Sequence, residues 1–176
     1  MESFDINKAP FEIERRFLIE YPDTDRLRAM PGYHSVHMEQ SYLSASEGFI
    51  GGRVRSIEDE NGTRYVYTYK LRLTDMRRRE FEKEISEEEY LGLLVHKTPG
   101  TITISKDRHI FSYGGLVYEL DVYSFWDDKA TLEAEVESES TPIPIPPCVR
   151  LIKEVTDDRR YNNSQLAKNR GVIEAQ

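Results

Sequence analysis

The sequence predicts an α+β protein built around an eight-stranded antiparallel β-barrel with flanking helices. Eight segments alternate in side-chain character or are rich in β-branched and aromatic residues, as strands are. Turn residues separate the segments, and the pairs Asn61-Gly62 and Gly114-Gly115 are typical of hairpins. Only short helical stretches lie between them. Many short strands joined by hairpins favour closure into a barrel.

The strands are expected from periodicity and from the turns that bound them. Segment 11–19 shows the alternation most clearly, and 63–73 is rich in Tyr, Val and Thr. The remaining strands are expected over 35–43, 48–57, 77–85, 101–110, 116–125 and 129–138.

Helices are expected at three places. A short helix over 23–30 ends at Pro31-Gly32, and the run Ser86–Glu89 forms a capping box that begins a helix over 89–96. Residues 141–147 hold four prolines, so this segment is expected to be irregular. A helical tail is expected from about Val149.

Composition limits the class of protein. The 176 residues are enough for one domain spanning 1–176. A net charge of −8 gives no support for general nucleic-acid binding. The single cysteine, Cys148, excludes a disulfide within the chain. Because no stretch has the length of a membrane span, we expect a cytoplasmic protein that does not enter a membrane.

Charged residues recur at every second position on seven of the expected strands. On any one strand this pattern is typical of a solvent-exposed face, but the whole set favours a different reading. We therefore predict that the charges face the barrel interior, and that apolar neighbours such as Phe17, Ile57 and Ile104 face outward beneath helices. The charged sets are Glu12, Glu14 and Arg16; Arg53 and Arg55; Lys70 and Arg72; Arg78, Glu80, Glu82 and Glu84; Lys106 and Arg108; Glu119 and Asp121; and Glu133, Glu135 and Glu137.

An interior crowded with both signs of charge predicts a particular kind of ligand. Buried charges need partners, and a polyanion together with divalent cations would supply them. Arginine and lysine donate to phosphate oxygens, and carboxylates are the ligands that Mg²⁺ and Mn²⁺ prefer. The pattern therefore indicates a metal–polyphosphate site.

The segment Glu12-x-Glu14-x-Arg16 resembles the ExExK signature that opens the CYTH, or triphosphate tunnel metalloenzyme, family. The later charged sets follow the family's order along nearly the whole chain. The resemblance implies an eight-stranded tunnel, closed in part by a C-terminal helix, that binds a triphosphate with Mg²⁺ or Mn²⁺. Members include inorganic tripolyphosphatases, thiamine triphosphatases, RNA triphosphatases and class IV adenylate cyclases. Arg16 departs from the family, which has lysine there.

The resemblance also implies roles for individual residues. Arg16, Lys70 and Asp121 are expected to be catalytic, with Asp121 and Glu119 as candidates to orient the attacking water or a metal-bound water. Substrate phosphates are expected to bind Arg53, Arg55, Lys70, Arg78, Lys106 and Arg108. Metal ligands are expected at Glu12, Glu14, Glu80, Glu82, Glu135 and Glu137. The competing interpretation of each residue is a solvated strand charge in a salt bridge.

The sequence thus predicts a metal-dependent hydrolase that cleaves a phosphoanhydride bond of inorganic tripolyphosphate or of an organic triphosphate. One alternative is a class IV adenylate cyclase that makes cyclic AMP from ATP. Another is a non-catalytic protein that binds polyphosphate or nucleotides, which the departure at Arg16 keeps open. The expected partner is a triphosphate-containing small molecule, and a homodimer is left open.

Overall fold

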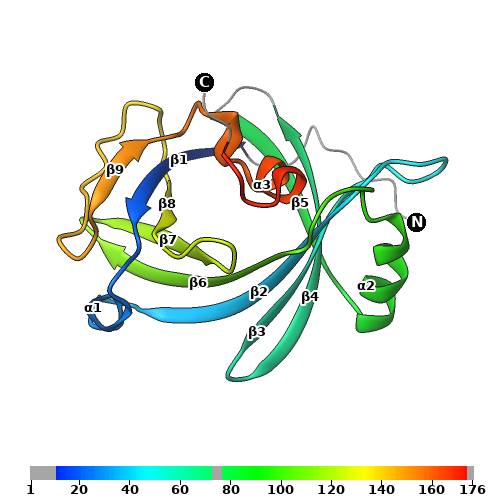
Figure 1. Cartoon of the computed structure of the whole chain (residues 1–176), viewed down its shortest axis with the longest axis horizontal. Helices are drawn as coiled ribbons and strands as arrows, with labels where there is room; N and C mark the ends of the chain where they lie inside the picture. The colour runs from blue at the N-terminus through cyan, green and yellow to red at the C-terminus, as the bar shows by residue number, and fades with distance from the viewer. Residues whose placement is uncertain (1–10, 73–76, 174–176) are drawn as a thin grey trace.

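The computed structural model describes residues 11–72 and 77–173, with the side chains of 11, 12, 70–72 and 77–80 outside the description. Its helices are α1 (Thr24–Arg28), α2 (Glu87–Leu93) and α3 (Asn163–Asn169), with short 3-10 turns η2 (Leu94–His96) and η3 (Arg159–Tyr161) (Figure 1). Its strands are β1 (Phe11–Glu20), β2 (His34–Leu43), β3 (Gly52–Asp59), β4 (Gly62–Arg72), β5 (Arg77–Ile85), β6 (Ile104–Tyr113), β7 (Leu116–Tyr123), β8 (Lys129–Glu135) and β9 (Leu151–Glu154).

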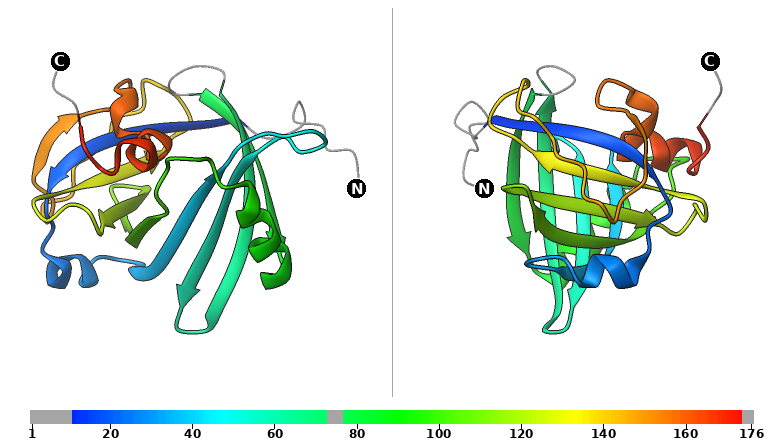
Figure 2. Two further views of the ribbon diagram at one scale, coloured as in Figure 1. Left: turned by 45° about the vertical axis from the view of Figure 1, so that its right-hand side comes forward. Right: turned by 90° about the vertical axis from the view of Figure 1, so that its left-hand side faces the viewer.

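The strands form one antiparallel sheet that curls back on itself. Their order is β5-β4-β3-β2-β6-β7-β8-β1-β9, and β5 also pairs with β1 through Phe11↔Arg79, Glu12↔Arg78 and Ile13↔Arg77. This seam is short, because β1 then pairs with β9 from Phe17 onward. The views in Figure 2 show the strands wrapping round, with α2 on the outside. The predicted eight-stranded barrel with flanking helices is confirmed, with a short ninth strand added.

Two predictions about local structure have different outcomes. The capping box is present, since Ser86 Oγ accepts from Glu89 N and the Glu89 side chain accepts from Ser86 N. The helical tail from Val149 is wrong, because the chain first forms β9 and turns into α3 only at Asn163. A four-residue strand is too short to show a period, and it forms because the open edge of β1 is available for pairing.

Apolar residues on the outer face pack beneath the helices and the proline-rich segment. Leu27 of α1 and Val149, which follows the prolines, join Phe17, Leu120 and Leu132 in one buried cluster. A second cluster lies where Tyr90 of α2 packs over β3 and β4. Both clusters use strand positions that alternate with the charged ones, so the outward placement of Phe17 is confirmed.

The interior is not purely ionic, and this corrects one prediction. Register pairs Ile57 with Met38 and Ile104 with Gln40, on the face that also carries Arg55 and Lys106. Ile57 and Ile104 therefore point inward, because residues two apart on a strand share a face. Both are buried in apolar clusters. The inner face therefore mixes apolar with polar side chains, since Met38 lies opposite both Ile57 and Lys106 in the register.

Residues 155–171, which we call the C-terminal cap, cover one part of this inner face. Leu166 and Ala167 of α3 are fully buried against Leu18, Ile104 and Tyr123, which lie on the inner side of three strands. Backbone Ile102 N donates to Ala167 O at 2.9 Å, which anchors the cap to the start of β6. The closure by a C-terminal helix that the resemblance implies is therefore present (Figure 1).

Candidate functional site

The most buried part of the site is a cluster on β6 and β7. Asp121 is 0% exposed and Lys106 is 2% exposed. Lys106 Nζ lies 2.5 Å from Asp121 Oδ2, while Arg108 donates from Nε to Oδ1 at 2.7 Å and from Nη2 to Oδ2 at 2.8 Å. Register places Arg108 directly opposite Asp121, so neighbouring strands bring the charges together. Arg108 also donates to Glu119.

The electrostatics of this cluster favour an ionised Asp121. Burial opposes ionisation, but Arg108 and Lys106 outweigh it and hold the pKa of Asp121 well below its usual range. Burial, reinforced by the neighbouring Arg108, lowers the pKa of Lys106 to about 8. The lysine ammonium is therefore sensitive to pH just above neutrality, whereas a guanidinium remains charged.

Arg16 forms a second cluster with carboxylates of β1 and β8. Its Nε donates to Glu133 at 2.5 Å and its Nη2 donates to Glu14 at 2.7 Å. Burial acts against the charge, but Glu133 and Glu14 keep the pKa of Arg16 above its ordinary value. The other oxygen of Glu133 lies 3.7 Å from Arg108 Nη2, so Glu133 connects the two clusters.

The third part of the site lies on β2, β3 and β5. Arg55 is 7% exposed and its Nη2 donates to Glu82 at 2.5 Å. Arg53 lies opposite Tyr42 in the register. Burial raises the pKa of Tyr42, while Arg53, Arg16 and Arg55 act to lower it, so this hydroxyl lies in the field of three arginines.

Tyr42 is a site residue that was not among the residues predicted from the sequence. The missing signal was its parity, because Tyr42 shares the inner face of β2 with Gln40, whose Nε2 donates to the Tyr42 hydroxyl at 2.8 Å.

The remaining predicted residues are less closely tied to this centre. Glu135 lies opposite Glu14 in the register, but its side chain is exposed, as is that of Glu137 beyond the end of β8. Backbone register places Glu12 opposite Arg78 and Lys70 opposite Glu80. The side chains of these four residues lie outside the described part, so their predicted contacts stay predictions.

The donor chemistry of the inner face suits a hard divalent cation. Among the described side chains, no group of three or more His, Cys, Asp or Glu is close enough together to hold a metal ion. The register nevertheless aligns Glu14 with Glu135, and Glu12 follows on the same face of β1. Carboxylate oxygens on adjacent inward positions are the donors that Mg²⁺ and Mn²⁺ take.

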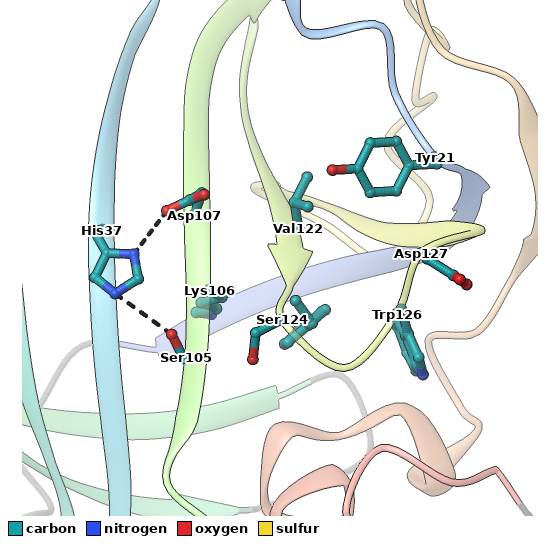
Figure 3. A pocket seen from close by; sticks show the side chains of 10 residues that line it. Tyr21, His37, Ser105, Lys106, Asp107, Val122, Ser124, Trp126 and Asp127 are labelled. Atoms are coloured by element: carbon teal, nitrogen blue, oxygen red, sulfur yellow. Dashed lines mark hydrogen bonds and ion pairs between the residues drawn. The ribbon is translucent and has the colours of Figure 1, made fainter.

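A separate hollow of about 440 Å³ lies over the other side of β6 and β7 (Figure 3). There His37 Nδ1 lies 2.7 Å from Asp107, and Ser105 Oγ lies 3.5 Å from His37 Nε2. The hydrogen bond with Asp107 is the main reason that the pKa of His37 is raised. His37, Ser105 and Asp107 alternate with the inward residues, so they belong to the outer face and not to the ionic site.

Fold and site together define a class of protein, an antiparallel barrel whose interior holds a paired network of arginine, lysine and carboxylate side chains. No family model matches the chain. The chain is 31% identical to the inorganic triphosphatase of Nitrosomonas europaea over 159 residues, covering 89% of this chain and 96% of that protein.

Solved structures show the same likeness. The crystal structure of an inorganic triphosphatase matches with a TM-score of 0.57 and 29% identity, covering 93% of this chain and 100% of that one. A Pyrococcus horikoshii protein with 18% identity matches in fold, with a TM-score of 0.53 over 73% of this chain and 80% of that one. The chain belongs to the CYTH family of triphosphate tunnel enzymes.

None of the helices in the described ranges combines the length and apolar character needed to cross a bilayer.

Proposed function

We propose that the protein hydrolyses a phosphoanhydride bond of a triphosphate, with inorganic tripolyphosphate as the first candidate substrate. The observation that carries this proposal is the set of buried cations on the inner face, of which Arg55, Lys106 and Arg108 are the clearest. These cations pair with carboxylates of the inner face, and a polyanion is a ligand whose phosphate oxygens could also accept from cations gathered on separate strands of one barrel. The relative's activity on inorganic triphosphate supports the same substrate class.

Phosphate binding falls to the cations. Arg53 and Arg55 of β3 and Arg108 of β6 present planar guanidinium groups, which donate to two phosphate oxygens at once. Lys106 supplies a point charge beside them, and Lys70 and Arg78 are proposed to complete the set. Phosphoryl transfer depends mainly on positioning and on neutralising charge, so this arrangement supplies much of what the reaction requires.

Asp121 is proposed to act by holding cations. Both of its oxygens already accept hydrogen bonds, from Lys106 and Arg108, and its lowered pKa keeps it from accepting a proton near neutral pH. We therefore replace the expected role of orienting water with that of positioning the two cations.

Divalent metal is proposed as the second requirement. Glu12, Glu14 and Glu135 would hold it, with Glu80, Glu82 and Glu137 assisting. Bound Mg²⁺ or Mn²⁺ neutralises phosphate charge and lowers the pKa of an attacking water. The chain's own part is to present carboxylates beside the arginines, so that one polyanion can meet metal and guanidinium together.

A panel of phosphate-release assays tests the function. Tripolyphosphate, thiamine triphosphate and ATP are each incubated with Mg²⁺ or Mn²⁺, and products are separated to distinguish orthophosphate, ADP and cyclic AMP. We expect orthophosphate, with tripolyphosphate the best substrate. Cyclic AMP from ATP would indicate the cyclase, and tight binding without any product would indicate a binding protein.

We further propose that the chain is one CYTH-like domain acting on this small molecule in the cytoplasm.

A further inference from the structure

Arg16 is engaged on two sides, by Glu14 of its own strand and by groups from distant parts of the chain. On one side are the carboxylates of Glu14 and Glu133, described above. On the other side Nη1 donates to Asn162 Oδ1 at 2.8 Å and to the backbone oxygen of Tyr161 at 3.3 Å. These two partners belong to the C-terminal cap. Four hydrogen bonds therefore join three segments of the chain at one side chain that is only 12% exposed.

The backbone of Arg16 takes part in the same junction. Its amide donates to Thr156 Oγ1 at 3.1 Å, and Val155 N donates to its carbonyl at 2.8 Å. Side chain and main chain of one residue thus hold the start of the cap and the residues just before α3.

The conformation of Asn162 supports the same link from the side of the cap. It occupies the N-cap position of α3, where an asparagine side chain usually accepts from the first helical amides. In this chain the side chain makes no capping hydrogen bond, and its oxygen accepts from Arg16 instead. The local stabilisation that asparagine offers at a helix start is given up for a long-range contact.

We propose that Arg16 is a positioning residue that fastens the C-terminal cap over the inner face and orients Glu14 and Glu133, and that it is not a phosphate ligand or a water-activating cation. Its guanidinium donates in several directions from one plane, and a lysine ammonium at the same position is a single point that cannot span all four acceptors. The geometry therefore accounts for arginine where the family has lysine. The link itself is argued from contacts alone, and its bearing on turnover rests on the proposed triphosphatase function.

The link predicts a coupling between cap and carboxylates. When Arg16 loses its cap partners, its remaining donors still hold Glu14 and Glu133, so phosphate affinity changes little. When Arg16 itself is replaced, the cap loosens and two inward carboxylates, Glu14 and Glu133, lose their shared cation. Replacing the cap partner Asn162 is therefore expected to affect the cap alone, whereas replacing Arg16 is expected to affect both the cap and the site.

The test uses the full chain with Asn162→Ala, Asn162→Asp and Arg16→Lys, and with Arg55→Lys as a matched arginine control outside the cap. Hydrogen exchange of amides 155–171 is measured without substrate, and kcat and KM for tripolyphosphate are measured separately. We expect Asn162→Ala and Arg16→Lys to speed hydrogen exchange in the cap by roughly tenfold. Each variant loses hydrogen bonds to the cap, and a loss of this size raises the population of the open cap by about that factor. Asn162→Asp, which still accepts from Arg16, should retain protection.

The kinetic measurements separate positioning from phosphate binding. Asn162→Ala should leave KM within about twofold of wild type, and Arg16→Lys should lower kcat by roughly tenfold more than it raises KM, as expected when carboxylates are misplaced but a cation remains. Arg55→Lys should raise KM without changing cap exchange.

Unchanged cap exchange in both Arg16→Lys and Asn162→Ala would overturn the proposal, as would a rise in KM as the main effect of Arg16→Lys. If Arg16→Lys does not fold, the pair Asn162→Ala and Asn162→Asp still decides the question. A wild-type protein that releases no phosphate would refute the proposed function while leaving the exchange result intact.

Discussion

Arg108 binds Asp121 through two parallel hydrogen bonds, of 2.7 Å and 2.8 Å, in the bidentate geometry that suits a guanidinium and a carboxylate. Lys106 contacts the same carboxylate, so one buried acid joins two buried bases. Arg108 also contacts Glu119 and Glu133, so further carboxylates hold this guanidinium in place. A phosphate would meet cations that are already held in place, which lowers the entropic cost of binding.

Replacing Asp121 by asparagine should therefore destabilise the fold strongly. The change leaves two buried cations without their shared carboxylate, which typically costs about 3–5 kcal/mol. Urea unfolding measures this loss as a decrease in the free energy of unfolding. The control is Glu119→Gln, which removes a half-exposed partner of Arg108 and should cost less than about 1 kcal/mol. Equal losses in the two variants would show that Asp121 does not organise the cations.

The pH dependence of turnover should report Lys106. Its pKa of about 8 lies below the ordinary value of 10.5, so Lys106 loses its charge as pH rises through 8 in the free enzyme. We expect kcat/KM for tripolyphosphate to fall above pH 8, because kcat/KM reports the free enzyme. Lys106→Arg should move that fall to higher pH, since a guanidinium stays protonated.

The same shift has a consequence for stability, with opposite sign. Between pH 8 and 10.5 the unfolded chain holds a proton on Lys106 that the folded chain has released. Stability should therefore rise with pH across this window through this group, and the penalty should be fully present below pH 8. A Lys106→Met variant should lack this rise in a pH series of urea unfolding curves.

The activity prediction has its own contrary outcome. A fall in kcat/KM above pH 8 that persists in Lys106→Arg would show that the fall is due to another group or to the substrate.

Removing Arg55 should abolish turnover and spare the fold. Arg55 is buried beside Thr68, but its carboxylate partner Glu82 is nearly half exposed and can be hydrated when alone. Arg55→Ala should lower kcat/KM for tripolyphosphate by roughly 100-fold or more, the scale on which one site-directed donor acts. Circular dichroism should match wild type.

The control for Arg55 is Arg64→Ala on the neighbouring strand β4, where the side chain is exposed. Its kcat/KM should stay within about threefold of wild type, since surface substitutions rarely disturb a site. Retained turnover in Arg55→Ala, or a similar loss in Arg64→Ala, would contradict phosphate binding by Arg55.

Metal binding should depend on Glu135. Titration of Mn²⁺ into the protein by calorimetry is expected to give an affinity that Glu135→Gln weakens by roughly tenfold or more, because an amide oxygen is a poorer ligand than a carboxylate. Glu58→Gln, an exposed carboxylate of β3 whose parity points it outward, is the matched control. Equal affinity in all three proteins would exclude Glu135 from the metal site.

The sequence predicted what depends on local pattern. Strand periodicity located β1 and β4, the capping box located α2, and parity placed Arg55 and Asp121 inside. Each of these follows from residues within a few positions of one another.

What the sequence did not predict depends on contacts between distant segments. β9 forms only because β1 offers an edge. Ile104 lies inside where the cap packs against it, and Ile57 lies inside against Met38 and Val66 of neighbouring strands. The contact between Arg16 and Asn162 joins residues 146 positions apart, and no periodicity encodes such a pairing. A local reading of Asn162 predicts a helix cap, which is the role its side chain gives up.

The cap should be sensitive to substitution at Gly171, where the chain leaves α3. Gly171 has a φ of 77°, a conformation that side chains with a Cβ disfavour, and an added Cβ would lie 2.3 Å from Phe125 Cδ2. Gly171→Ala should cost about 1–2 kcal/mol from the backbone and roughly 1–3 kcal/mol more from overpacking. Trp126 should also report the change, because its indole nitrogen donates to Gly171 O at 2.9 Å and its fluorescence should shift with the cap.

The control is Gly92→Ala within α2, where nothing lies within 4 Å of an added Cβ, and alanine there should stabilise the protein by about 0.5–1 kcal/mol. Wild-type stability and fluorescence in Gly171→Ala would show that the cap does not pack against Phe125 and Trp126.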